Sequence, residues 1–163
     1  MNRTKGVYCT SRKLSSRRAT AIKYMMDSLL TLEELNRRRP EMYTTADCQV
    51  CQVGEKETQA HLASCREQKS LWKRIQKVAT VTAWNGLKER EKDRIPPQVL
   101  YEALFGKSEA EEIVNRKALI KGLILIKVEE KLEQLLHRQA AQKCINIVTR
   151  TVWNTFYDQV WRI

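Results

Sequence analysis

Three cysteines and one histidine fall close together in this chain, with the spacing Cys48-x2-Cys51-x9-His61-x3-Cys65. Two cysteines separated by two residues can turn both sulfurs toward one point, and residues four apart on a helix share a face. Thiolates and imidazole are ligands typical of a tetrahedral zinc site in which protein side chains fill every position. The spacing therefore predicts one structural Zn²⁺ ion that clamps a loop to a helix.

The alternative is that buried cysteines and a core histidine fall at this spacing by chance. The chain has five cysteines, an odd number, and its charged N-terminus has no apolar run behind it, which argues against a secreted disulfide framework. A closed metal site supports a fold and does not activate a nucleophile. No phosphate-cradling glycine loop or nucleophile elbow is present either, so we expect no enzyme.

Helices are the expected secondary structure, because five glycines and three prolines in 163 residues disfavour hairpin-rich β architecture. Thr31 and Glu34 have the spacing of a capping box for a short helix that ends before Pro40. Thr58 is placed to cap a helix carrying His61 and Cys65. The pattern predicts a mostly α fold: a small zinc-knuckle-stabilised helical bundle with a long C-terminal helical segment.

Four parts are expected along the chain. They are a disordered basic arm (1–14), a zinc-binding helical lobe (15–84), a linker (85–98) and a C-terminal helical lobe (99–163). The first lobe is predicted to open with a helix from Ser15 or Ser16 to about Leu30. The helical pattern of the last lobe is longer than a usual globular helix, so a break or two is expected, near Gly122 or Ala140-Ala141.

The net charge of +11 is uneven, because residues 1–24 carry seven Lys or Arg and no acid. A basic arm favours contact with a polyanion, most simply DNA or RNA, although it can also be a solvated tail that aids solubility. The basic stretch at 37–39 is either a phosphate-contacting patch or a solvated helix end favoured by the helix dipole. The candidate nucleic-acid contacts are Arg12, Lys13, Arg17, Arg18, Lys23, Arg37, Arg38 and Arg39.

Aromatic side chains leave a second function open. Trp72 and Trp84 can stack bases, but tryptophans at helical spacing are more often core residues. The side chains expected to pack the last helix onto the body are Trp153, Phe156 and Trp161, whereas an exposed set would mark a partner surface. The alternative function is therefore a protein-interaction module, in which zinc is purely structural and the C-terminal helices bind a partner.

The region of the four ligands resembles the zinc-binding domain that follows the polymerase in reverse transcriptases of non-LTR retroelements. The family's basic, leucine-containing helix is matched by residues 29–39, and its cysteine knuckle by residues 47–51. The family's Glu-Thr-x-x-His-Leu-x-x-x-Cys string is matched by residues 57–65, and its following tryptophan by Trp72. The resemblance covers residues 15–75, under half of the chain.

This resemblance implies a zinc-stabilised helical domain that contacts template nucleic acid with low sequence specificity. The chain is too short for a polymerase, and Tyr157-Asp158-Gln159-Val160 lacks the second aspartate of the paired-aspartate polymerase motif. We therefore expect an isolated module or a fragment. The basic arm is also compatible with a nuclear-import address, which predicts an intracellular, nuclear protein. No apolar stretch reaches the ~18 residues of a membrane span.

Overall fold

A computed structural model describes residues 19, 22–23 and 30–161 of the chain. The predicted basic arm and most of the helix expected before Leu30 lie outside the described residues, as do four of the candidate contacts, Arg12, Lys13, Arg17 and Arg18. The described residues form helices and one isolated β-bridge, with no strand among them. The prediction of a mostly α fold is confirmed.

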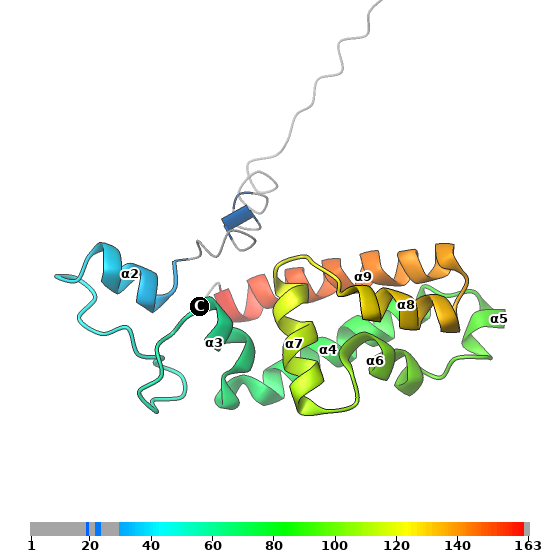
Figure 1. The fold of residues 1–163 in the computed structure, drawn as a ribbon, viewed down its shortest axis with the longest axis horizontal. Coiled ribbons are helices and arrows are strands. Elements are labelled where there is room, and N and C mark those ends of the chain that lie inside the picture. The colour runs from blue at the N-terminus through cyan, green and yellow to red at the C-terminus, as the bar shows by residue number, and fades with distance from the viewer. Residues whose placement is uncertain (1–18, 20–21, 24–29, 162–163) are drawn as a thin grey trace, which may run out of the picture.

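Eight α-helices are found within the described ranges, and Figure 1 shows that α2 and the coil after it lie at one end of a bundle formed by the later helices. None of these helices is long and apolar enough to cross a bilayer. A 3-10 turn (η1, Arg66–Gln68) precedes the bundle and a π-helical turn (η2, Tyr157–Trp161) follows it. The α-helices are α2 (Leu32–Arg38), α3 (Gln59–Ser64), α4 (Lys69–Asn85), α5 (Glu89–Lys92), α6 (Pro97–Phe105), α7 (Glu109–Ile120), α8 (Ile126–Leu135) and α9 (Arg138–Phe156).

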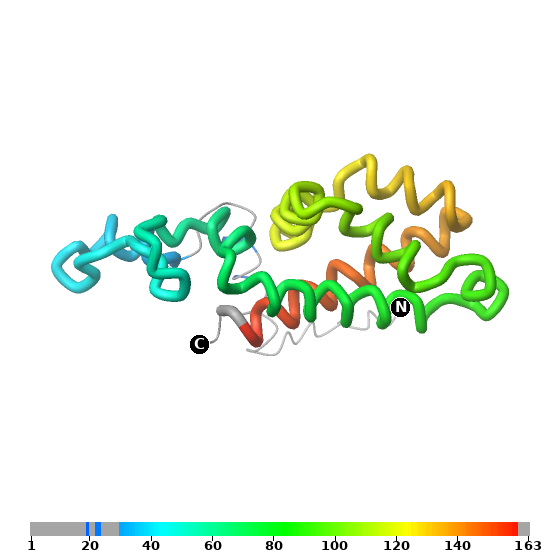
Figure 2. The backbone as a smooth tube through the Cα atoms, turned by 90° about the horizontal axis from the view of Figure 1, so that it is seen from below, coloured from blue at the N-terminus to red at the C-terminus, as the bar shows by residue number. Residues whose placement is uncertain are grey.

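The centre of the bundle is the pair of its two longest helices, α4 and α9, which lie side by side and antiparallel (Figures 1 and 2). Trp72 of α4 stacks on Phe156 of α9, with 5.2 Å between ring centroids, and neither side chain is exposed. Trp84 is half-buried against the core, and its Nε1 donates to the Ile95 carbonyl at 2.9 Å. Trp72 is therefore a core residue, as its spacing predicted.

One hydrophobic core runs from Leu62 to Phe156 and joins the two lobes expected from the sequence. The segment predicted as a linker contributes to this core, since Leu87 and Ile95 are buried and α5 lies between them. A charged stretch can still be ordered when a few apolar side chains anchor it on each side, which is the case here.

The C-terminal segment has the two breaks that its length predicted. The first lies at Gly122, which has a φ of +73°. The second lies at Leu136 and His137, a few residues before the position expected near Ala140-Ala141. His137 begins α9 as its N-cap, where its Nδ1 accepts a hydrogen bond from the Ala140 N–H at 3.4 Å. The two alanines are buried in the first turns of α9, and alanine favours helix more than any other residue.

Candidate metal centre

The four predicted ligands come together at the junction of the coil and α3. One donor atom from each of Cys48, Cys51, His61 and Cys65 lies within 4.8 Å of every other. The Sγ of Cys51 is 3.5 Å from Nε2 of His61. Cys48, Cys65 and His61 are buried and Cys51 is half-buried. This cluster can hold one metal ion, with every position around it supplied by the protein.

A tight turn between residues 47 and 56 presents the first two cysteines. An antiparallel bridge pairs Asp47 with Lys56, and the Cys48 N–H donates to the Glu55 carbonyl at 2.8 Å. Inside the turn the Gln52 N–H donates back to the Cys48 carbonyl at 3.1 Å. The chain reverses through left-handed conformations at Gln52 (φ +52°) and Gly54 (φ +77°). The two sulfurs converge because this turn is closed by backbone hydrogen bonds.

The third and fourth ligands are held by α3 and its cap. The Thr58 hydroxyl accepts from the His61 N–H at 2.9 Å, which confirms Thr58 as the N-cap. Cys65 is the C-cap, and its N–H donates to the His61 carbonyl at 2.7 Å. One turn of helix therefore places the imidazole and the last thiol on the same side, as their four-residue spacing predicted.

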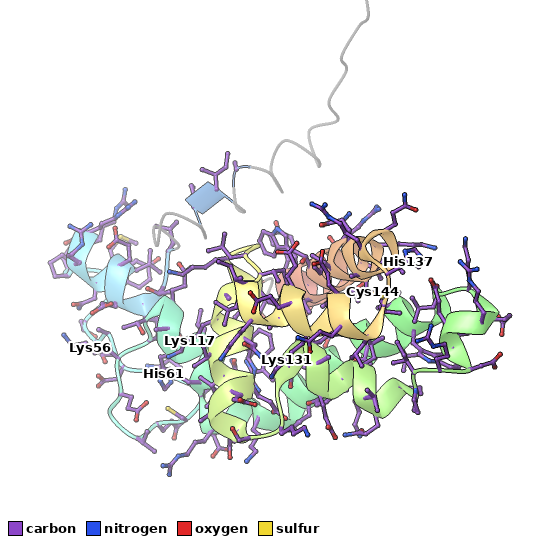
Figure 3. The ribbon with its side chains drawn as sticks, turned by 45° about the vertical axis from the view of Figure 1, so that its right-hand side comes forward. Lys56, His61, Lys117, Lys131, His137 and Cys144 are labelled. Atoms are coloured by element: carbon purple, nitrogen blue, oxygen red, sulfur yellow. The ribbon has the colours of Figure 1, made fainter. Side chains whose placement is uncertain are left out.

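Two side chains of the bundle hold α3 by its carbonyls. Trp72 Nε1 donates to the Leu62 carbonyl at 3.0 Å. The Arg116 guanidinium donates to the Ala63 carbonyl at 2.8 Å and stacks over the Trp72 ring at 5.1 Å from its centroid. Leu62 and Ala63 lie between the two ligands of α3, so the bundle positions the ligands directly. Figure 3 shows His61 toward one end of the molecule, and α3 packs against α7.

Glu55 orients the imidazole. Its Oε2 lies 2.8 Å from Nδ1 of His61, on the side of the ring away from the sulfurs. A proton held on Nδ1 by this carboxylate leaves Nε2 free to bind a metal ion. Glu55 is not among the residues that the sequence predicts for the site, because no spacing rule identifies such a partner. Its position between the second and third ligands was the available signal.

The surroundings of Cys65 favour the protonated thiol over the thiolate in the metal-free protein. Burial raises the pKa of this thiol to about 11, and the neighbouring Cys48 and Cys51 act in the same direction. Hydrogen bonds with the backbone of Glu67 and Gln68 oppose this rise. Because a metal binds the thiolate, binding at neutral pH releases the proton of this group.

The basic stretch at 37–39 ends α2, and all three arginines are exposed. Glu34 binds two of them: its carboxylate accepts from the guanidinium of Arg37 at 2.6 and 2.9 Å and from that of Arg38 at 2.6 Å. The hydrogen bonds from Arg37 and Arg38 lower the pKa of Glu34 to about 2. Half of the predicted capping box is present, since the Thr31 hydroxyl accepts from the Glu34 N–H at 3.4 Å.

A contact with Glu57, between the knuckle and α3, fixes α2 beside the metal cluster. The Glu57 carboxylate accepts from the Leu32 N–H at 3.1 Å, just before α3 begins. The other predicted contact that the structure describes, Lys23, is exposed. The structure thus places 37–39 on the same small lobe as the cysteines.

Comparison of the chain with models of known protein families, with curated proteins and with solved structures finds no match.

Proposed function

We propose that Cys48, Cys51, His61 and Cys65 bind one structural zinc ion. Zinc bonds of about 2.3 Å to sulfur and about 2.05 Å to nitrogen, arranged as a tetrahedron, imply a sulfur–nitrogen separation of about 3.6 Å. The 3.5 Å between Cys51 Sγ and His61 Nε2 fits this value. Three thiolates with one oriented imidazole are also a donor set that binds zinc in preference to harder cations.

Metal analysis of two alanine variants tests this assignment. Cys48→Ala removes a ligand, whereas Cys144→Ala removes a buried cysteine of α9 that lies outside the cluster. The wild-type protein and C144A should each hold one equivalent of zinc, and C48A should lose it on dialysis. Zinc retained equally by C48A would exclude the site.

The proposed ion is structural because the lobe that it closes has little core of its own. Between residues 31 and 60 only Thr31 and Cys48 are buried, and the hydrophobic core begins at Leu62. Metal binding is then the main source of order for α2 and the knuckle. Chelation should remove amide protection there, while α4 and α9 keep theirs in hydrogen exchange.

We further propose that the chain is a non-catalytic, nucleic-acid-binding module of the retroelement reverse transcriptase type, with low sequence specificity and a nuclear location. The observation that carries this proposal is the exposed 37–39 stretch, which the Leu32–Glu57 contact ties to the metal lobe. The net charge of +11 supports attraction to phosphates. All metal positions are filled by protein, which supports a binding role over a hydrolytic one.

Two variants of α2 with opposite effects on charge test this function by titration of nucleic acid at several salt concentrations. Glu34→Gln frees Arg37 and Arg38 and should strengthen binding. Replacing the three arginines at 37–39 with glutamine should weaken binding and reduce its salt dependence, by about 0.9 in the log–log slope for each lost phosphate contact with duplex DNA. Absent or salt-insensitive binding by the wild-type protein would refute the proposal.

An exposed apolar loop favours the alternative function, a protein-interaction module. Leu123, between α7 and α8, is 54% exposed, and Ile126, the first residue of α8, is 74% exposed. A groove beside them is lined by Trp153 of α9. Lys121 and Lys127 flank the apolar residues, which suits an acidic amphipathic helix. A labelled peptide of that type should bind the wild-type chain and not L123S/I126S. Equal binding by both would remove this candidate.

A further inference from the structure

The two central helices carry positive charge without any acidic residue. α4 contains Lys69, Lys73, Arg74 and Lys77, and α9 contains Arg138, Lys143 and Arg150, with no aspartate or glutamate in either. Three of these seven cations pair with carboxylates of other segments: Lys69 with Glu109, Lys73 with Glu112 and Arg138 with Glu133. The other four are Arg74, Lys77, Lys143 and Arg150.

These four cations are all exposed, and Arg150 also lines the groove beside the 122–126 loop. On α4, Arg74 and Lys77 are exposed on the same face as Val78 and Val81, because the four positions are spaced by three and four residues. On α9, Lys143 and Arg150 share an exposed face with Asn146 by the same spacing. None of the four forms an ion pair within the part of the chain that the structure describes.

Contacts at the two ends join these faces into one surface. The Lys143 Nζ donates to the Gly86 carbonyl at the end of α4, at 2.6 Å. At the other end, Arg74 donates to the Gln159 side chain just beyond α9, at 2.8 Å. These contacts pair the first half of α4 with the turn after α9 and the end of α4 with the first half of α9, so the helices run antiparallel, and Figures 1 and 2 show them side by side. From Arg74 to Gly86 this surface extends about 18 Å along the helix axis.

The chemistry of this surface suits the backbone of a duplex. Phosphates are contacted by lysine, arginine and amide side chains, and a duplex carries one charge per about 1.7 Å of its axis. Single strands are instead bound through exposed aromatic rings on which bases stack. The aromatic residues of α4 and α9 are used otherwise: Trp72 and Phe156 are buried, Trp84 donates to Ile95, and Trp153 lines the groove beside the 122–126 loop.

We infer that Arg74, Lys77, Lys143 and Arg150, exposed on the α4–α9 pair, form a track that binds the phosphate backbone of double-stranded nucleic acid. This inference rests on the proposed nucleic-acid function, but it places the main contact away from α2. The arginines at 37–39 are weaker candidates because Glu34 already binds Arg37 and Arg38. The acidic residue nearest in sequence to α9 is Asp158, beyond its end.

Titration of a labelled short duplex DNA with the zinc-loaded full chain, at salt concentrations between about 50 and 200 mM, tests the track. The test variant is K77Q/K143Q/R150Q. The matched control, K107Q/K127Q/K131Q, removes the same charge from exposed lysines of the α6–α8 side. The test variant should bind at least about tenfold more weakly and lose about 2 to 3 units of salt slope, while the control changes little. Unchanged melting temperatures with zinc show that each variant is folded.

The outcomes separate this inference from the function on which it rests. A wild-type chain that does not bind duplex would defeat both. Wild-type binding that is lost on replacing residues 37–39, but not in the test variant, would overturn the track and leave the function standing. Equal losses in the test and control variants would show attraction by net charge alone and also overturn it. Tighter binding of a single strand than of the duplex would contradict the assignment to a duplex.

Discussion

Replacing Arg116 with methionine tests the link between the bundle and the metal lobe. The Arg116 side chain is 5% exposed, donates to the Ala63 carbonyl at 2.8 Å, and lies over Trp72. Burial lowers the pKa of the guanidinium, with Glu112 opposing this effect, yet an arginine keeps its proton at neutral pH. The variant therefore removes a buried charge and leaves a buried carbonyl without its partner.

The expected loss follows from these contacts. A hydrogen bond from a charged donor contributes about 1.5 to 3 kcal/mol, and a desolvated cation over tryptophan contributes about 1 to 2 kcal/mol. Methionine keeps part of the apolar contact with Trp72, which reduces the total. Glu112 is not left alone, because Lys73 Nζ remains 2.6 Å from its Oε1. We expect Arg116→Met to lower the free energy of unfolding by about 3 kcal/mol.

Denaturant unfolding with saturating zinc, followed by circular dichroism, measures this loss. Lys69→Met is the matched control, since its ion pair with Glu109 joins the same two helices but is more than half exposed at both ends. The control should cost less than about 1 kcal/mol. Similar losses of unfolding free energy in R116M and K69M would refute a stabilising role for the buried link between the bundle and the metal lobe.

Three further predictions concern the site and the core. Glu55→Gln should weaken zinc binding by about 10- to 100-fold, measured by competition with a chelator, because the carboxylate no longer orients His61. Burial raises the pKa of Cys144 to about 11, so its thiol stays protonated and should resist alkylation at pH 8 until the chain unfolds, when its pKa falls to the ordinary range and mass spectrometry should detect labelling. Gly106→Ala should destabilise the fold by more than about 2 kcal/mol in thermal or denaturant unfolding, because φ there is +101° and an added Cβ would lie 2.4 Å from Cβ of Glu111.

The ligand cluster and the caps could be predicted from the sequence because their geometry is local. Cys48 and Cys51 are close enough in sequence for one turn to bring them together, and His61 and Cys65 need a single helical turn. The Thr58 hydroxyl bonds a backbone group three residues later, whatever the rest of the fold does. Such features depend on spacing and residue type alone.

The buried polar contacts could not be predicted because both partners come from distant segments. Arg116 follows acidic residues in an ordinary charged helix, yet it is buried because Trp72 and Ala63 surround it from other elements. His137 is half-exposed, but its pairing with Glu91 and its capping of α9 set a helix boundary. The Glu91 contact requires α5 to be folded against the start of α9.

The metal lobe depends on the helical bundle more than the bundle depends on the metal lobe. A helix as short as α3 is not stable alone, so it presents His61 and Cys65 correctly only while Trp72 and Arg116 hold its carbonyls. The bundle has no comparable need, since its core begins at Leu62 and includes no side chain of the knuckle. Substitutions in the bundle should therefore reach the metal site through α3, whereas loss of the knuckle should leave the α4–α9 surface in place.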